Sequence, residues 1–175
     1  NKQQWIDHLQ MDGPVEIQKP EPQSGKSSWK IQGTQLVLTT DKAGNADVQI
    51  DGTPAQIHLA DGLLKGKTIR VDQAQNLVWM NDPGEFTVPL AALNRRNSSV
   101  EWFKAPFCKW NGRMQFDGET CEIRGDIQYE GGFRTSPNSR PGTLATTSER
   151  TANPSFWWLV GRSNVLRVKL DDKLD

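Results

Sequence analysis

Residues 44–89 read GNADVQIDGTPAQIHLADGLLKGKTIRVDQAQNLVWMNDPGEFTVP. Short runs in which apolar and polar residues alternate are separated here by Gly, Asp, Asn and Pro. Runs of this kind with a turn signal about every ten residues are typical of an all-β sandwich, roll or solenoid. A glycine precedes a strand-like run at Gly13, Gly44, Gly84 and Gly125, at intervals of roughly 30 to 40 residues. The sequence therefore predicts an all-β fold in which one small unit is stacked repeatedly.

The length fits one domain over residues 1–175, or two closely stacked halves at 13–89 and 100–175. Residues 90–99 between the halves fit one helical turn or a linker. Residues 135–154 are polar and contain Pro, which predicts a long loop.

The first twelve residues fit either a short helix or a strand. We favour the strand, because the glycine-led run at Gly13 follows directly. The chain begins with Asn1, shows no signal-peptide pattern, and stops just after a strand-like alternation. We therefore expect a fragment of a longer protein.

The composition is neutral and only moderately apolar. There are 21 basic and 21 acidic residues, apolar residues make up 35% of the chain, and the mean hydropathy is −0.67. The absence of a basic excess argues against a dedicated nucleic-acid partner. The low apolar content suits thin sheets in which every second residue faces water. Seven tryptophans against one tyrosine provide large side chains that could fill a sheet interior or line an apolar groove.

The two cysteines are too few for a disulfide framework. A hairpin about Asp117-Gly118 would place Cys121 opposite a residue near Gln115, and not opposite Cys108. A disulfide is therefore possible only across layers of the fold. We interpret both cysteines as unpaired and buried, because a free cysteine packs as a small apolar side chain.

No catalytic, cofactor or metal motif occurs in the sequence: there is no phosphate loop, no nucleophile elbow, no HExxH and no CxxC. His8 and His58 have no partner at a ligand spacing. Asp51, Asp61 and Asp117 each precede a glycine, and this is typical of a turn. The sequence therefore predicts a non-enzymatic protein with no catalytic residues, no metal and no cofactor.

An apolar stripe follows the alternating runs, and both an ordinary dry core and an open-sided groove for acyl chains fit it. The candidate lipid-contacting residues are Val48, Ile50, Ile57, Leu59, Ile69, Val71, Leu77, Trp79, Phe86, Val88, Met114, Phe116, Ile123 and Ile127.

Residues 44–89 resemble the OstA-like repeat of lipopolysaccharide-transport proteins, of the LptA and LptC type. The positions that carry the resemblance are Gly44, Val48, Gly52, Pro54, Ala55, Ile69, Leu77, Trp79, Gly84 and Phe86. Residues 110–129 are similar to a second copy, through Met114, Phe116, Gly118, Ile123, Gly125 and Ile127. Together the matches run from Gly13 to Tyr129, with weaker agreement at 166–170.

This resemblance implies a twisted two-sheet β-jellyroll, or β-taco, in the periplasm of a Gram-negative cell. It implies that the apolar interior holds the acyl chains of lipopolysaccharide or another lipid. It also implies that open edge strands stack end to end, on copies of the chain or on other β-jellyroll envelope proteins, in a bridge to the outer membrane.

Two other functions remain open on the sequence. One is a structural assembly module of a large envelope protein that takes no ligand. The other is a carbohydrate-binding β domain that uses exposed tryptophans such as Trp157 and Trp158.

Overall fold

The chain forms ten strands and a four-residue helix within the part that the computed structural model describes. The described residues are 6–18, 29–59, 62–94, 100–135 and 155–169. The elements are β1 (His8–Gln18), β2 (Trp29–Thr40), β3 (Ala46–Leu59), β4 (Gly62–Asp72), β5 (Leu77–Met80), β6 (Gly84–Thr87), α1 (Leu90–Leu93), β7 (Val100–Trp110), β8 (Arg113–Phe116), β9 (Thr120–Thr135) and β10 (Ser155–Lys169). The all-β prediction is confirmed.

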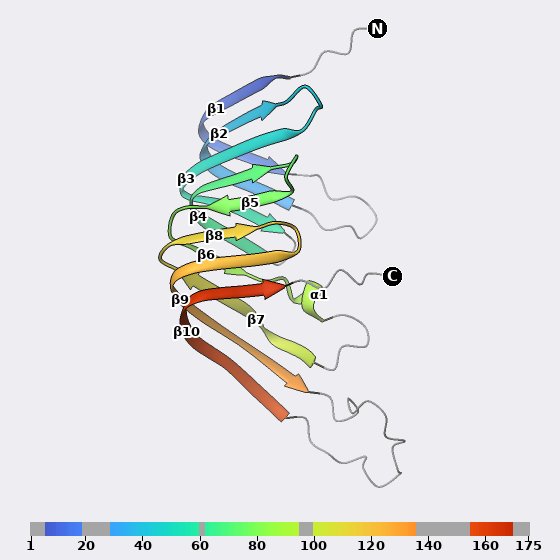
Figure 1. The fold of residues 1–175 in the computed structure, drawn as a ribbon, viewed down its shortest axis with the longest axis vertical. Coiled ribbons are helices and arrows are strands. Elements are labelled where there is room, and N and C mark those ends of the chain that lie inside the picture. Colours follow the sequence, from blue (N-terminus) through green and yellow to red (C-terminus); the bar gives the residue numbers. More distant parts are fainter. Residues whose placement is uncertain (1–5, 19–28, 60–61, 95–99, 136–154, 170–175) are drawn as a thin grey trace, which may run out of the picture.

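All ten strands belong to one antiparallel sheet. Its order is β1-β2-β3-β4-β5-β8-β9-β7-β6, and β10 pairs with β9. An additional pairing between β4 and β6 closes a partial ring through β4, β5, β8, β9, β7 and β6. Figure 1 shows the strands lying across the long axis of the molecule, with β1 at one end and β10 at the other.

The sheet is a stack of levels, each of which is one long strand or two short strands. β4 pairs along its length with β3, and its opposite edge pairs with β5 at one part and β6 at another. β9 likewise pairs along its length with β10, and its opposite edge pairs with β8 and β7. The pairs β5 with β6 and β8 with β7 therefore each complete one level.

Each long strand is interrupted near its middle, so that each level has two arms. The register shifts between residues 12 and 15 of β1, 32 and 35 of β2, 51 and 55 of β3, and 163 and 165 of β10. The first arm comprises residues 8–12, 35–40, 46–51, 68–72, 77–80, 113–116, 120–124 and 165–169. The second arm comprises residues 15–18, 29–32, 55–59, 62–66, 84–87, 100–110, 127–135 and 155–163.

Glycines mark the bends between the arms more often than they begin strands. Gly13 and Gly125 lie inside β1 and β9, with φ of 107° and 86°, in the region that glycine adopts without strain. Of the four predicted glycines, only Gly84 begins a strand, and Gly44 lies in the turn before β3. The prediction that all four glycines begin strands was therefore wrong for Gly13 and Gly125, because a bulge or bend also demands glycine.

The Asp51-Gly52 pair was predicted to make a tight turn, and it instead lies within β3. A side chain on Gly52 would overlap the backbone of Pro54 and Ala55, so glycine permits the sharp bend here. By contrast, Asp117-Gly118 does form the turn between β8 and β9. The Asp117 carboxylate accepts hydrogen bonds from the backbone N–H groups of Glu119 and Thr120, at 3.0 and 2.7 Å.

Three other predicted segments can be compared with the structure. The favoured strand before Gly13 is confirmed from His8 onward. Of the helical turn and the linker that residues 90–99 fitted, residues 90–93 form the helical turn, α1. Within the predicted loop at 135–154, residue 135 ends β9, and residues 136–154 lie outside the described residues, as does Asp61.

The core lies between the two arms. Its buried apolar residues are Val15, Leu36, Ile50, Ala55, Leu64, Ile69, Met80, Cys108, Trp110, Met114, Ile123 and Ile127. The arms are in direct contact, since a β-carbon on Gly66 of the second arm would overlap Met80 Cε of the first. Trp110 is 1% exposed, and its indole N–H donates to the carbonyl of Asp82 at 3.2 Å.

Candidate functional site

The apolar stripe predicted from the sequence falls mostly on the inner faces of the two arms. Its buried members are Ile50, Ile69, Met114, Ile123 and Ile127. Its half-buried members that pack against the core are Val48, Ile57, Phe86 and Phe116. Val71 is half-buried and lies opposite Val48 and Val78, and Val88 is half-buried just beyond β6. The side chain of Leu59 lies outside the described residues.

Two residues of the predicted stripe lie on the opposite surface. Trp79 lies opposite Arg70 and Gln115, and Leu77 opposite Asp72, whereas Val78 and Met80 contribute to the core. The prediction followed the wrong alternate residues of β5, because the run Leu-Val-Trp-Met is apolar throughout and has no polar residue to mark the outer face.

Burial decreases along each arm with distance from the bend. In β3, Ile50 is fully buried while Val48, two residues farther from the bend, is half-buried. The same order is found for Leu36 and Leu38, Ile69 and Val71, Met80 and Val78, Met114 and Phe116, Ile123 and Cys121, Val15 and Ile17, Ala55 and Ile57, and Ile127 and Tyr129. The core is therefore dry at the bend and is covered incompletely at the side away from it.

The half-buried residues form a continuous row along the first arm, which we call the open-side row. It consists of Leu38, Val48, Val71, Val78, Phe116 and Cys121, which are paired in turn across β2, β3, β4, β5, β8 and β9. The second arm supplies Ile17, Ile31, Ile57, Phe86 and Tyr129. Leu38, Val78 and Cys121 of this row were not among the lipid-contacting residues predicted from the sequence. No local signal distinguishes Val78 from Leu77 and Trp79, because all four residues of β5 are apolar.

Both cysteines lie on the inner faces with free thiols. Cys108 lies opposite Phe86 and Tyr129, and Cys121 opposite Phe116. Burial raises the pKa of each thiol to about 11; for Cys121, the negative charges of Cys108 and Asp117 add to this pKa shift. The interpretation that both cysteines are unpaired is confirmed, whereas full burial holds for Cys108 and not for Cys121, which is half-buried.

The two ends of the stack are open sheet edges with exposed apolar side chains. Among the strands that the structure describes, β1 pairs only with β2, and β10 pairs only with β9. Of the exposed large apolar residues in the described chain, all but one lie in or beside these two strands: Ile6, Leu9, Met11, Phe156, Trp157, Trp158, Leu159, Val160, Val165 and Val168, with Phe103 on β7. Both edges therefore combine exposed apolar side chains with the charges and proline that ordinarily protect an edge: Asp12, Pro14 and Glu16 on β1, and Arg162, Arg167 and Lys169 on β10.

Trp157 and Trp158 lie on opposite faces of β10. Trp158 packs edge-on against Phe103 at a centroid distance of 5.3 Å, and Lys104 Nζ lies 5.5 Å from its ring centroid. Trp157 lies opposite Phe133 on the other face. The pair therefore does not form one common aromatic surface.

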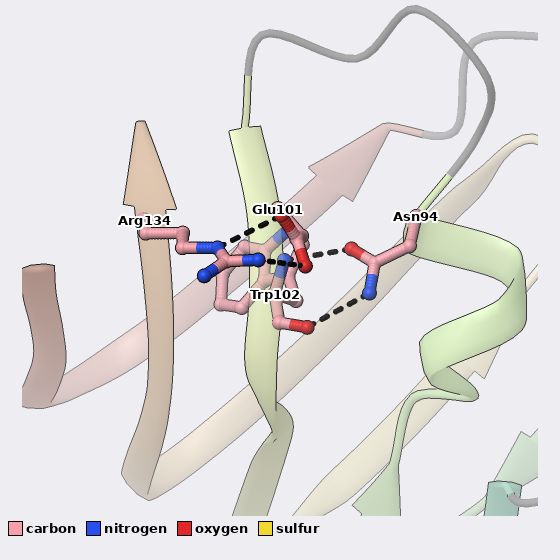
Figure 2. Close-up of polar contacts among 4 residues, drawn as sticks. All are labelled: Asn94, Glu101, Trp102 and Arg134. Atoms are coloured by element: carbon pink, nitrogen blue, oxygen red, sulfur yellow. Dashed lines mark hydrogen bonds and ion pairs between the residues drawn. The ribbon is translucent and has the colours of Figure 1, made fainter. Parts of the chain in front are cut away.

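A third potential edge, at the start of β7, is closed by side chains (Figure 2). The Asn94 amide donates to the Trp102 carbonyl at 2.8 Å and accepts from the Trp102 N–H at 2.6 Å. At Glu101, the residue before Trp102 in β7, the side-chain carboxylate accepts two hydrogen bonds from Arg134, at 2.8 and 2.7 Å. Asn94 thus occupies the position of a partner strand.

The outer face near β10 carries a charge cluster. The Glu122 carboxylate lies between Arg124 and Arg167, and Arg167 Nε is 2.6 Å from it. Hydrogen bonds from Arg124 and then Arg167 lower the pKa of Glu122 to about 2. This cluster joins β9 to β10 at the end of the stack.

No group of three or more His, Cys, Asp or Glu side chains that could hold a metal occurs within the described ranges. A His58 ring nitrogen lies 3.2 Å from the Gln56 side-chain oxygen, and His8 is exposed in β1. In the described part of the chain, no helix is long and apolar enough to cross a membrane.

No family model matches the chain, and searches of curated proteins and of solved structures find no match either. The comparisons therefore assign no family.

Proposed function

We propose that the chain is a non-enzymatic OstA-like module of the cell envelope, with the β-jellyroll or β-taco form found in lipopolysaccharide transport. In this proposal it resides in the periplasm of a Gram-negative bacterium. The open side of the bent sheet accepts the acyl chains of lipopolysaccharide or a similar envelope lipid.

The burial gradient is the observation that carries this proposal. A half-buried apolar row runs through six consecutive strands on the open side, parallel to the long axis. Extended acyl chains have the shape and the apolarity to cover such a row, and each buried methylene contributes about 0.8 kcal/mol. The cavities found at the outer surface are not lined by the open-side row, so the proposal concerns an open groove and not an enclosed pocket.

Equilibrium binding of the purified chain to lipopolysaccharide, beside the same molecule stripped of its acyl chains, tests the proposal. We expect binding that requires the acyl chains. Val48→Lys should weaken it at least about tenfold, equivalent to about 1.4 kcal/mol, because it places a charge in the open-side row. The long lysine side chain can extend to solvent, so the fold should persist.

Thr39→Lys is the matched control, since it also adds one positive charge, at an exposed position next to Leu38 of the row. Equal binding of both lipopolysaccharide forms, or an equal effect of the two variants, would remove the lipid from the proposal.

A second function, bridging by edge-strand stacking, is favoured by the two open edges. β1 carries Asp12 and Glu16 and no Lys or Arg, whereas β10 carries Arg162, Arg167 and Lys169 and no Asp or Glu. The β10 edge of one copy therefore complements the β1 edge of another in charge, and both offer exposed apolar side chains. Such pairing is heterologous and would build an open stack.

Sedimentation velocity over a range of protein concentrations tests the bridging function. We expect assembly that Val160→Lys on β10 suppresses, because a lysine on an edge strand opposes further pairing. Thr39→Lys is the control, as Thr39 is exposed on β2, which is paired on both sides. A chain that stays monomeric at the highest concentration would contradict self-stacking and leave only a different edge partner.

A further inference from the structure

A cavity of about 230 Å³ opens on the outer face of the first arm, away from the open-side row. It lies over β3, β4 and β5, where Gln49, Arg70 and Trp79 form one cross-strand row. It is lined by Gln49, Thr68, Arg70, Trp79, Met80, Asn81 and Asp82. Six of these seven lining residues are polar or aromatic, and Met80 adds an apolar surface.

Part of this lining is held in place by the fold. The Asp51 carboxylate accepts hydrogen bonds from the Gln49 amide and from the Thr68 hydroxyl, each at 2.6 Å. Asp51 thereby fixes both side chains and leaves the Gln49 amide oxygen as an acceptor. The carbonyl of Asp82 is likewise engaged, by the Trp110 indole.

The rest of the lining is not satisfied by the protein. The Arg70 guanidinium, the Trp79 indole N–H and the Asn81 side-chain amide make no hydrogen bond or ion pair with any described residue. Trp79 is only half-buried although it is large and apolar. An aromatic ring with unengaged donors beside it is the composition of a ligand site, where a few placed polar groups orient the ligand.

We propose that this cavity binds one neutral pyranose unit of a carbohydrate. The C–H face of a sugar ring packs on the negative face of an indole, which Trp79 supplies. The planar groups of Arg70, Asn81, Gln49 and Asp82 present paired donors or acceptors that match neighbouring hydroxyls.

Size and charge select this ligand over others. The volume equals the space of roughly eight water molecules, which suits one ring and is below the range for larger ligands. Arg70 and Asp82 have opposite charges, and the Asp51 carboxylate lies behind the wall, so the site offers no excess positive charge to an anionic ligand. This site is separate from Trp157 and Trp158.

Ligand-observed NMR on the full chain tests the proposal, with D-glucose, D-galactose and D-mannose as probes. We expect saturation transfer to at least one of these sugars, weaker transfer to D-glucuronate, and none to glycerol, which has neighbouring hydroxyls but no ring face. Trp79→Ala should abolish the signal, and Arg70→Met should lower the affinity about tenfold. Trp158→Ala, at an exposed tryptophan outside the cavity, should leave binding unchanged.

Arg70 is exposed and unpaired among the described residues, so Arg70→Met keeps the test valid even if Trp79→Ala impairs folding. Absence of transfer to all three sugars at concentrations of about 10 mM would overturn the proposal, because the site would then contribute less than about 3 kcal/mol. Loss of binding in Trp158→Ala with retention in Trp79→Ala would also overturn it.

Discussion

The side chain of Asn94 satisfies both main-chain polar groups of Trp102, donating to the carbonyl at 2.8 Å and accepting from the N–H at 2.6 Å. It closes an edge of β7 that would otherwise resemble those of β1 and β10. The fold thus leaves only the two ends of the stack open among the strands that the structure describes.

Replacing Asn94 with alanine should lower the free energy of unfolding by about 1 kcal/mol, because two hydrogen bonds at a partly solvated edge are lost. Urea denaturation measures this change. Asn111→Ala is the control, since the exposed Asn111 side chain makes no hydrogen bond with a described residue. Equal losses in the two variants would show that Asn94 does not close the edge.

Trp110 and Trp79 should respond very differently to replacement by alanine. Trp110→Ala should destabilise the protein by about 3–5 kcal/mol, since it empties the bend of the sheet. Trp79→Ala should cost about 1 kcal/mol, because this side chain lies half-buried on the outer face. Thermal or urea unfolding of both variants compares them, and similar losses would place Trp79 in the core after all.

The two thiols, of buried Cys108 and half-buried Cys121, should resist modification in the native protein. With pKa values of about 11, Cys108 and Cys121 carry little thiolate at pH 8, and the thiolate is the reactive form. A chromogenic disulfide reagent should therefore react slowly with the folded chain and rapidly with the unfolded one. Fast reaction of both thiols under native conditions would contradict their burial.

Because the pKa values of the same thiols are raised in the folded state, we expect the free energy of unfolding to fall at alkaline pH. Their folded-state pKa is raised from 9.0 to about 11, so the stabilisation is present below pH 9 and is lost as the pH rises through 11. Unfolding midpoints between pH 8 and 11 should fall less steeply in a Cys108→Ala, Cys121→Ala double variant. An unchanged slope would argue against the shift.

Because the pKa of Glu122 is lowered in the folded state, we expect the free energy of unfolding to fall as the pH becomes acid. Its folded-state pKa is lowered from 4.5 to about 2, so its stabilising effect is present above pH 4.5 and is lost as the pH falls toward 2. Glu122→Gln should flatten the stability profile between pH 2 and pH 5. Glu119→Gln, at an exposed glutamate in the adjoining turn, is the control, and equal profiles for the two variants would contradict the role of Glu122.

The sequence by itself determined the β class, the turn at Asp117-Gly118 and most of the inward-facing residues, because turn chemistry and two-residue alternation are local properties. Ile50, Ile69 and Ile123 were placed correctly by alternation alone. Alternation does not locate a bend inside a strand, which is why Asp51-Gly52 was predicted to be a turn.

Only the tertiary structure decided which face of an uninterrupted apolar run is inside, and therefore the position of Trp79. It also decided that burial decreases toward one open side and that the exposed apolar residues gather at the two terminal strands. These properties depend on pairing between residues far apart in the chain. A one-residue change of register would reverse every side chain without altering the local pattern.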